Sequence, residues 1–131
     1  MYKKCKQYYK DTKTPICVIS VEKKRSQKEL IEELKPLFNH IKVLIIVDEK
    51  NNDLENAYML VWRVVNNIDS NRDIYIDGSI ISVDATNKNS LDNFKRRWPD
   101  DVVCTKSVID DLRERKIIDI DDSFISRWGI L

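Results

Sequence analysis

The amino-acid sequence predicts an α/β domain, a three-layer sandwich around a small, mostly parallel sheet. Two observations lead to this class. Short apolar runs at residues 16–21, 43–47 and 80–83 alternate with amphipathic segments that have helical spacing. The run VLIIV at 43–47 contains no polar residue, which is typical of a strand covered on both faces inside a parallel sheet. Right-handed crossovers between successive strands then make neighbouring strands parallel.

Length and composition favour one domain with a buried core. The chain has 131 residues, of which 42% are hydrophobic, so we expect a single domain over residues 1–131. Its 23 Lys and Arg nearly balance 22 Asp and Glu, which gives no electrostatic argument for a nucleic-acid partner. Apolar runs are far shorter than the ~18 residues of a membrane span, and residues 1–10 lack the apolar core of a signal peptide. We expect a cytoplasmic protein.

The rarer residue types exclude several chemistries. The three cysteines show no CxxC spacing, which favours free thiols in a reducing compartment. Gly78 and Gly129 are the only glycines, so the sequence has neither a dinucleotide-binding loop nor a P-loop. The single histidine, His40, follows a predicted helix end, where it can interact with the last carbonyl groups. These patterns supply no metal site.

The first forty residues are predicted to form an arm, a strand and a helix. Residues 1–13 are rich in lysine and tyrosine, and we expect a short helix or a loose arm there. β-branched residues at 16–21 predict the first strand. Ser26 and Glu29 have the spacing of a capping box, which begins an amphipathic helix.

The centre of the chain predicts a strand, a helix and two further strands. Asp48 and Asp84 each directly follow an apolar strand. Asp53 has the position of an N-cap for the helix between them. A short strand at 73–76 precedes Gly78, which permits a tight turn.

Asp48 and Asp84 are the first candidates for a ligand site. Ligands of open α/β sheets bind beyond the carboxyl ends of the strands, so the two carboxylates would share a crevice with Thr86. Alternatively both carboxylates cap turns or helix N-termini, and we favour this interpretation. Arg63 and Arg72 would suit a carboxylate ligand through paired hydrogen bonds, although surface ion pairs are the commoner role of such arginines.

The last third of the chain is predicted to contain a long loop and short helices. Residues 87–104 are irregular, with Phe94 and Trp98 as expected anchors and a small strand at 102–104. The segment 107–110 resembles a capping box and predicts a helix to about residue 115.

Residues 123–131 form a predicted docking or interface tail. Gly129 is expected to stop a short helix there. Apolar residues at a chain terminus usually dock, either on their own domain or on a second subunit. The tail carries four such residues, namely Phe124, Trp128, Ile130 and Leu131.

A series of short motifs runs through residues 16–104 in a fixed order. In sequence they are Val47-Asp48, Val61-Trp62-Arg63, the segment 69–73, and Val83-Asp84-Ala85-Thr86. This series resembles the C-terminal domain of the UbiD family of carboxy-lyases (3-polyprenyl-4-hydroxybenzoate decarboxylase-like). In that family the corresponding motifs are VD, VxWA with R, a DPxRD-like segment, and IDAT.

The resemblance implies a non-oxidative decarboxylase of aromatic or α,β-unsaturated acids that uses prenylated flavin mononucleotide (prenylated FMN), a divalent metal and potassium. The family's catalytic arginine, two glutamates, and flavin and metal ligands belong to a larger N-terminal part without a counterpart in this sequence. We therefore expect no catalytic residue here and no cofactor bound by this chain alone. The segment 73–83 is also shorter than the family's loop, which borders the substrate.

The leading hypothesis is a stand-alone UbiD C-terminal-like domain. It would be a small subunit or scaffold of a decarboxylase, and its partner would be a larger UbiD-like catalytic subunit or another copy of this chain. The alternative is a non-enzymatic module. Such a module would oligomerise through residues 123–131 or bind a small molecule with Asp48, Asp84 and Thr86.

Overall fold

The computed structural model describes residues 2–38 and 40–128, and contacts divide the chain into two compact units. Unit 1 comprises residues 1–98, and unit 2 comprises residues 99–131. The predicted sheet and the residues at its strand ends all belong to unit 1. A family domain can comprise both units, so the single domain predicted over residues 1–131 stays a prediction.

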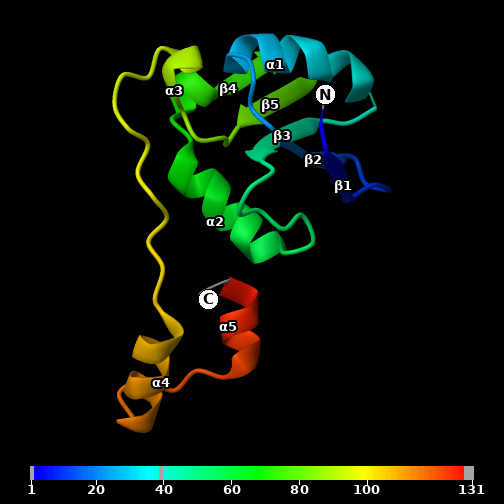
Figure 1. Cartoon of the computed structure of the whole chain (residues 1–131). Helices are drawn as coiled ribbons and strands as arrows, with labels where there is room; N and C mark the ends of the chain where they lie inside the picture. Colours follow the sequence, from blue (N-terminus) through cyan, green and yellow to red (C-terminus); the bar gives the residue numbers. More distant parts are fainter. Residues whose placement is uncertain (1, 39, 129–131) are drawn as a thin grey trace. The chain divides into compact units, whose positions relative to one another are not determined.

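Unit 1 is built around one five-stranded sheet with the strand order β1-β2-β3-β5-β4 (Figure 1). The central pairs β2·β3 and β3·β5 are parallel, whereas the outer pairs β1·β2 and β4·β5 are antiparallel. The α/β class is confirmed, but the sheet is mixed, so the expected mostly parallel sheet is not found. The strands are β1 (Lys4–Tyr8), β2 (Ile16–Val21), β3 (Val43–Asp48), β4 (Ile74–Asp77) and β5 (Ile80–Asp84).

The two edge strands explain why the sheet is mixed. Residues 1–13 were expected as a helix or an arm, but β1 pairs with β2 from Lys4 opposite Ser20 to Tyr8 opposite Ile16. An edge strand is only partly buried, so its sequence can be polar. The polar sequence KCKQY of β1 therefore gave no apolar pattern from which to predict a strand. At the other edge, Gly78 has a φ of +58°, which allows the tight turn predicted from the sequence. This turn joins β4 and β5 as an antiparallel hairpin, which the sequence had not predicted.

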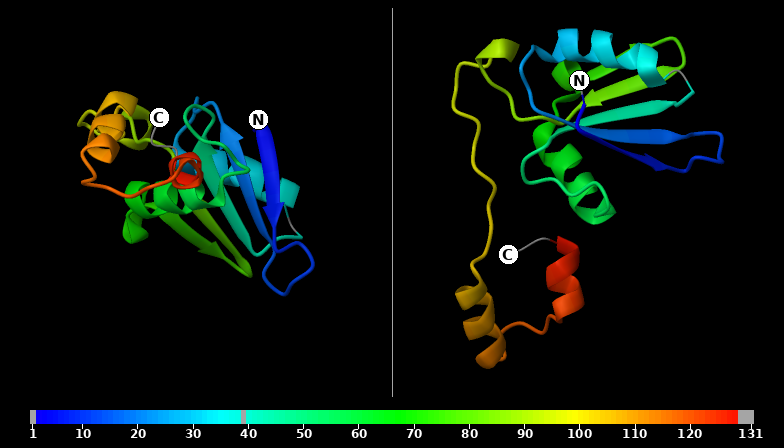
Figure 2. Two further views of the ribbon diagram at one scale, coloured as in Figure 1. Left: turned by 90° about the horizontal axis from the view of Figure 1, so that it is seen from below. Right: turned by 45° about the vertical axis from the view of Figure 1, so that its right-hand side comes forward.

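Helices cover both faces of the sheet, as the two views in Figure 2 show. Helix α1 (Gln27–Leu34) and the 3-10 helix η1 (Lys35–Phe38) pack on one face, and α2 (Ala57–Asn67) packs on the other. Successive side chains of β2 point to opposite faces of the sheet, so this strand contributes residues to both apolar clusters. The α1 cluster includes Cys17, Ile19, Leu30, Leu34, Leu44 and Ile46, and the α2 cluster includes Val18, Val47, Leu54, Leu60 and Ala85.

Of two predictions about where helices begin, one is confirmed and the other is wrong. The capping box at Ser26 is confirmed, because its side chain accepts a hydrogen bond from Glu29 N and the Glu29 carboxylate accepts one from Ser26 N. Helix α2 is capped by Asn56, whose Oδ1 accepts from Met59 N, and not by Asp53. The Asp53 carboxylate instead accepts from the N–H two residues later, within the preceding turn.

The predicted aromatic anchors of the loop after β5 are confirmed within unit 1. The rings of Phe94 and Trp98 lie 5.2 Å apart. The Arg72 guanidinium lies 5.8 Å from the centre of the Phe94 ring and 5.9 Å from that of Trp98. Arg72 belongs to the short helix α3 (Ser70–Asp73), which leads directly into the edge strand β4, so these contacts tie the loop to the edge of the sheet.

Unit 2 contains helices α4 (Lys106–Glu114) and α5 (Asp122–Trp128). Thr105 occupies the N-cap position of α4 without a side-chain hydrogen bond, so the capping box predicted at 107–110 is wrong. The small strand predicted at 102–104 is also absent from the described chain, and Val102 is 93% exposed.

The predicted tail lies partly within α5. Ile125 is buried, and the rings of Phe124 and Trp128 lie 6.3 Å apart. Gly129, Ile130 and Leu131 lie outside the described residues. No helix in the described part of the chain is long and apolar enough to cross a bilayer.

Candidate functional site

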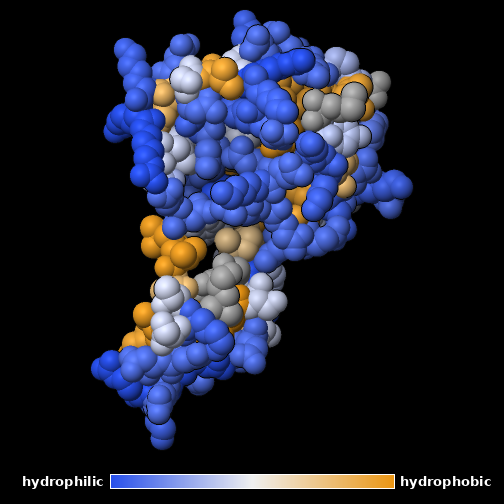
Figure 3. All heavy atoms as spheres, in the orientation of Figure 1, coloured by the Kyte–Doolittle hydropathy of each residue, from blue (hydrophilic) through white to orange (hydrophobic). Residues whose placement is uncertain are grey.

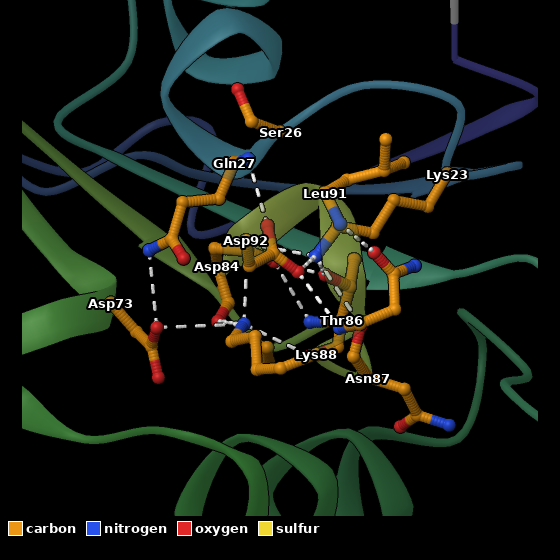
Figure 4. Close-up of polar contacts among 12 residues, drawn as sticks. Lys23, Ser26, Gln27, Asp73, Asp84, Thr86, Asn87, Lys88, Leu91 and Asp92 are labelled. Atoms are coloured by element: carbon orange, nitrogen blue, oxygen red, sulfur yellow. Dashed lines mark hydrogen bonds and ion pairs between the residues drawn. The ribbon is translucent and has the colours of Figure 1, made fainter. Parts of the chain in front are cut away.

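Polar side chains gather where the parallel strands end (Figure 4). Lys23 follows β2, Asp48 ends β3, and Asp84 ends β5. The parallel register places Val21 opposite Asp48 and Ile46 opposite Asp84, so all three strands end at the same edge of the sheet. We call the buried ionic group at this edge the strand-end cluster; its members are Lys23, Asp73, Asp84, Thr86, Lys88 and Asp92.

Lys88 is the centre of the strand-end cluster and its side chain is fully buried. Its Nζ donates hydrogen bonds to the carbonyl oxygens of Asp84 (2.7 Å) and Thr86 (2.9 Å). The same atom lies 3.2 Å from Asp84 Oδ2 and 3.6 Å from Asp73 Oδ1. Burial lowers the pKa of Lys88, while the two carboxylates act in the opposite direction.

Lys23 supplies the second cation of the strand-end cluster. Its Nζ donates to Thr86 Oγ1 at 2.8 Å and to Asp92 Oδ2 at 2.5 Å. It also lies 3.6 Å from Asp84 Oδ2, so it joins the end of β5 to Asp92 in the loop that follows. The other oxygen of Asp92 accepts from Gln27 N at 3.0 Å, which ties this loop to the first turn of α1.

Asp73 balances the charge of Lys88 and is itself held by several donors. Arg72 donates to it from Nε (2.8 Å) and Nη2 (2.6 Å), and the backbone N–H of Asp69 donates at 2.8 Å. Burial by itself would raise the pKa of Asp73, but the hydrogen bonds from Arg72 and Asp69 hold it below its ordinary value. Gln27 Nε2 adds a further hydrogen bond at 3.1 Å.

Asp48 and Asp84 both accept hydrogen bonds from the turn after β5. Asp84 Oδ1 accepts from Thr86 N (2.9 Å) and Thr86 Oγ1 (2.6 Å), and Asp48 Oδ2 accepts from Asn87 N (2.7 Å). Burial raises the pKa of Asp48, and the Asn87 N–H opposes this shift. This is the geometry that the cap interpretation predicts for both aspartates, whereas a ligand role for them stays a prediction.

Arg63 lies inside the molecule and not on its surface. It is 4% exposed, and its Nε donates to Asn52 Oδ1 at 3.1 Å. Asn52 in turn donates to the carbonyl oxygen of Asp48 at 2.9 Å. Arg63 therefore supports the turn after β3 from a buried position, whereas the sequence had suggested a surface position for it.

Sequence reasoning missed Lys23, Lys88 and Asp73. A usable signal was present for Lys88, which follows Asp84 by four residues in DATNK, so that one turn brings its amine back to the strand end. Asp73 was expected as part of a strand, and only the tertiary structure places it against Lys88. Phe124 and Trp128 belong to α5 of unit 2.

The strand-end cluster is closed by its own ion pairs. Asp84 Oδ2 makes no hydrogen bond in the described chain, but it faces the amines of Lys88 and Lys23. Among residues 2–38 and 40–128, no group of three or more His, Cys, Asp or Glu is placed to hold a metal ion. The arrangement stabilises the turn that joins β5 to the following loop.

Comparison with known proteins gives the family of this fold. The 3-octaprenyl-4-hydroxybenzoate carboxy-lyase C-terminal domain, UbiD_C, matches residues 4–110. Two uncharacterized proteins of Helicobacter pylori, from strains 26695 and J99, are each 46% identical over 114 residues. These residues are 86% of this chain but 18% of each relative, so the chain spans less than a fifth of their length.

A solved structure supports the same assignment. It is an evolved dimeric form of the UbiD-class enzyme HmfF from Pelotomaculum thermopropionicum in complex with prFMN. The two chains are 26% identical with a TM-score of 0.50, over 64% of this chain and 20% of that chain. From the motif series, the fold and these matches, we conclude that this chain belongs to the UbiD carboxy-lyase C-terminal domain family.

Proposed function

We propose that this chain is a supporting domain of a UbiD-type non-oxidative decarboxylase of aromatic or unsaturated acids. It would act in the cytoplasm as a small subunit or scaffold and leave the reaction to a larger catalytic part. The observation that carries the proposal is the closed strand-end cluster. Ligands of open α/β sheets bind beyond the carboxyl ends of strands, and here Lys23 and Lys88 fill that position with internal ion pairs.

The residues of this chain do not fit the family's cofactor. A flavin phosphate requires backbone N–H groups or cations that are open to it, and the amines of Lys23 and Lys88 are already bound by carboxylates and carbonyl oxygens. A divalent metal requires several oxygen ligands around one point, and Asp48 and Asp84 are turned toward backbone donors. We therefore propose that prenylated FMN, the divalent metal and potassium bind to the catalytic partner.

An apolar surface on α2 supports association with a partner. Val61 and Val65 lie one helical turn apart and are 63% and 69% exposed. Beside them, an apolar groove of about 220 Å³ runs between α2 and the sheet. The face of the molecule drawn in Figure 3 is largely hydrophilic. Exposed apolar patches on a protein surface often mark protein interfaces. Lining residues of the groove include Tyr8, Ile16, Val18, Ile45, Leu60 and Val64.

Affinity capture from the native cell tests the subunit role. The tagged chain should recover a larger UbiD-like polypeptide, identified by mass spectrometry. The double substitution Val61→Glu, Val65→Glu should lose this partner, whereas Lys24→Glu, on an exposed side chain, should keep it. Recovery of no larger UbiD-like protein would refute the subunit role. It would favour the alternative, a homo-oligomer without a catalytic partner, which sedimentation of the purified chain would then detect.

Activity measurements test whether decarboxylation requires the catalytic partner. The purified chain is supplied with prenylated FMN, Mn²⁺ and K⁺ and assayed for carbon dioxide release from aromatic and unsaturated acids. We expect no turnover by the chain alone and turnover once the catalytic partner is added. Turnover by the chain alone would show that it carries the reaction itself.

A further inference from the structure

Two of the three cysteines lie against each other on neighbouring strands. The Sγ atoms of Cys5 on β1 and Cys17 on β2 are 3.0 Å apart, and both residues are free thiols. The antiparallel register places Cys5 opposite Ile19 and Gln7 opposite Cys17, so the two thiols are diagonal neighbours on one face of the sheet. A disulfide bond is about 2.05 Å long, so the sulfur atoms need to approach by only about 1 Å to be joined.

The two thiols differ in their access to solvent. Cys5 lies on an edge strand and is exposed, whereas Cys17 is fully buried beneath α1. Burial raises the pKa of the Cys17 thiol, and its contact with Cys5 acts in the same direction. Cys5 is therefore the sulfur that a dissolved oxidant reaches, and Cys17 is the protonated partner held next to it.

We infer that Cys5 and Cys17 form a site of reversible oxidation, at which a peroxide converts the thiol pair into an intramolecular disulfide between β1 and β2. In the first step the sulfur of Cys5 attacks one peroxide oxygen and the O–O bond breaks. With hydrogen peroxide this yields a sulfenic acid on Cys5 and one water. In the second step the sulfur of Cys17 attacks the Cys5 sulfur, the S–O bond breaks, and the hydroxide leaves with the Cys17 proton as a second water.

The peroxide is the only added reactant that this oxidation requires. Two electrons pass from the two thiols to the peroxide, and a small thiol such as glutathione reverses the change through a mixed disulfide. The disulfide bond would join the edge strand β1 covalently to β2. The other side of β1 has no strand partner in the described sheet. It would also restrict the unfolded chain by closing the loop between positions 5 and 17, so the oxidised form should have a higher melting temperature.

Peptide mapping tests the site directly. The reduced chain is treated with about one equivalent of hydrogen peroxide, remaining thiols are alkylated, and trypsin is added without reductant. Cleavage after Lys4, Lys6, Lys13 and Lys23 isolates the two cysteines on separate peptides. We expect these two peptides joined, an intact mass lower by about 2 Da before alkylation, and an alkyl group on the remaining cysteine after it.

Matched variants separate this site from other thiol chemistry. Cys104→Ser should keep the linked peptides, because the sulfur contact is between Cys5 and Cys17, and Cys5→Ser should lose them without loss of folding. Closure should be at least about tenfold faster in the folded chain than in urea, because folding holds the sulfur atoms in contact. A disulfide to Cys104, a disulfide between chains, or further oxidation of Cys5 with Cys17 left free would overturn the inference. Equal rates in urea and buffer would do so as well.

Discussion

Replacement of Lys88 by methionine is the sharpest test of the strand-end cluster. Methionine keeps an unbranched chain of similar length but removes the charge and the three donors. The amine of Lys88 makes hydrogen bonds of 2.7 and 2.9 Å to the carbonyl oxygens of Asp84 and Thr86. It also neutralises Asp73 and Asp84, whose side chains are fully buried.

The size of the effect follows from these contacts. Hydrogen bonds from a charged donor contribute about 1.5–3 kcal/mol each, and two are lost in Lys88→Met. The desolvation of the lysine, visible in its lowered pKa, offsets part of this loss. Removal of one partner from a buried ion pair typically costs about 3–5 kcal/mol, because it leaves a buried charge uncompensated. We expect a loss within this range, a large share of the roughly 5–15 kcal/mol that stabilises a typical domain.

Urea unfolding followed by circular dichroism measures this loss. Lys24→Met is the matched control, because that side chain is 72% exposed and its surface ion pair contributes less than about 1 kcal/mol. The double variant Lys88→Met, Asp73→Asn should be less destabilised than the sum of its two single variants, by about 1 kcal/mol or more. A loss below about 1 kcal/mol, or strict additivity in the double variant, would refute the role assigned to this ion pair.

Three further predictions concern the loss of stability at low pH, the cap of helix α1 and the turn at Gly78. The pKa of Asp73 lies below its ordinary value of 3.8, so the unfolded chain takes up the proton first and stability falls as the pH drops below about 4. Asp73→Asn should flatten this decline in urea titrations between about pH 2.5 and 5, and an unchanged slope would contradict the assignment. Ser26→Ala should lower the unfolding free energy by about 1 kcal/mol through loss of the α1 cap, while Lys28→Ala on the same helix should change it little. Gly78→Ala should cost about 1–2 kcal/mol because φ is +58°, and Gly78→Asn should cost less; equal stability of all three proteins would exclude backbone strain.

Local sequence patterns determined several parts of the fold. The apolar run at 43–47 marked the central strand, and Ser26 with Glu29 marked the start of α1. Gly78 marked the tight turn that lies between β4 and β5. These features depend on residues close together in the chain, so periodicity, capping and backbone conformation are sufficient to predict them.

The candidate site was only partly visible in the sequence. The carboxylates at the strand ends could be found because each follows an apolar run directly, as Asp48 and Asp84 do. The lysines that close the site could not be found in the same way. Charged residues are usually exposed, so no sequence rule selects Lys23 as buried among this chain's many lysines. For Lys88 the one signal was its position four residues after Asp84.

The sequence by itself determined the α/β class, the central strands and the family of this chain. Only the tertiary structure decided that β1 is a strand, that the sheet is mixed, and that Lys88 meets Asp73. It also decided that Cys5 lies against Cys17. The physical reason is the same in each case. An edge strand takes its hydrogen bonds from a distant partner, and a buried ion pair or thiol pair exists only when the strand register brings its members together.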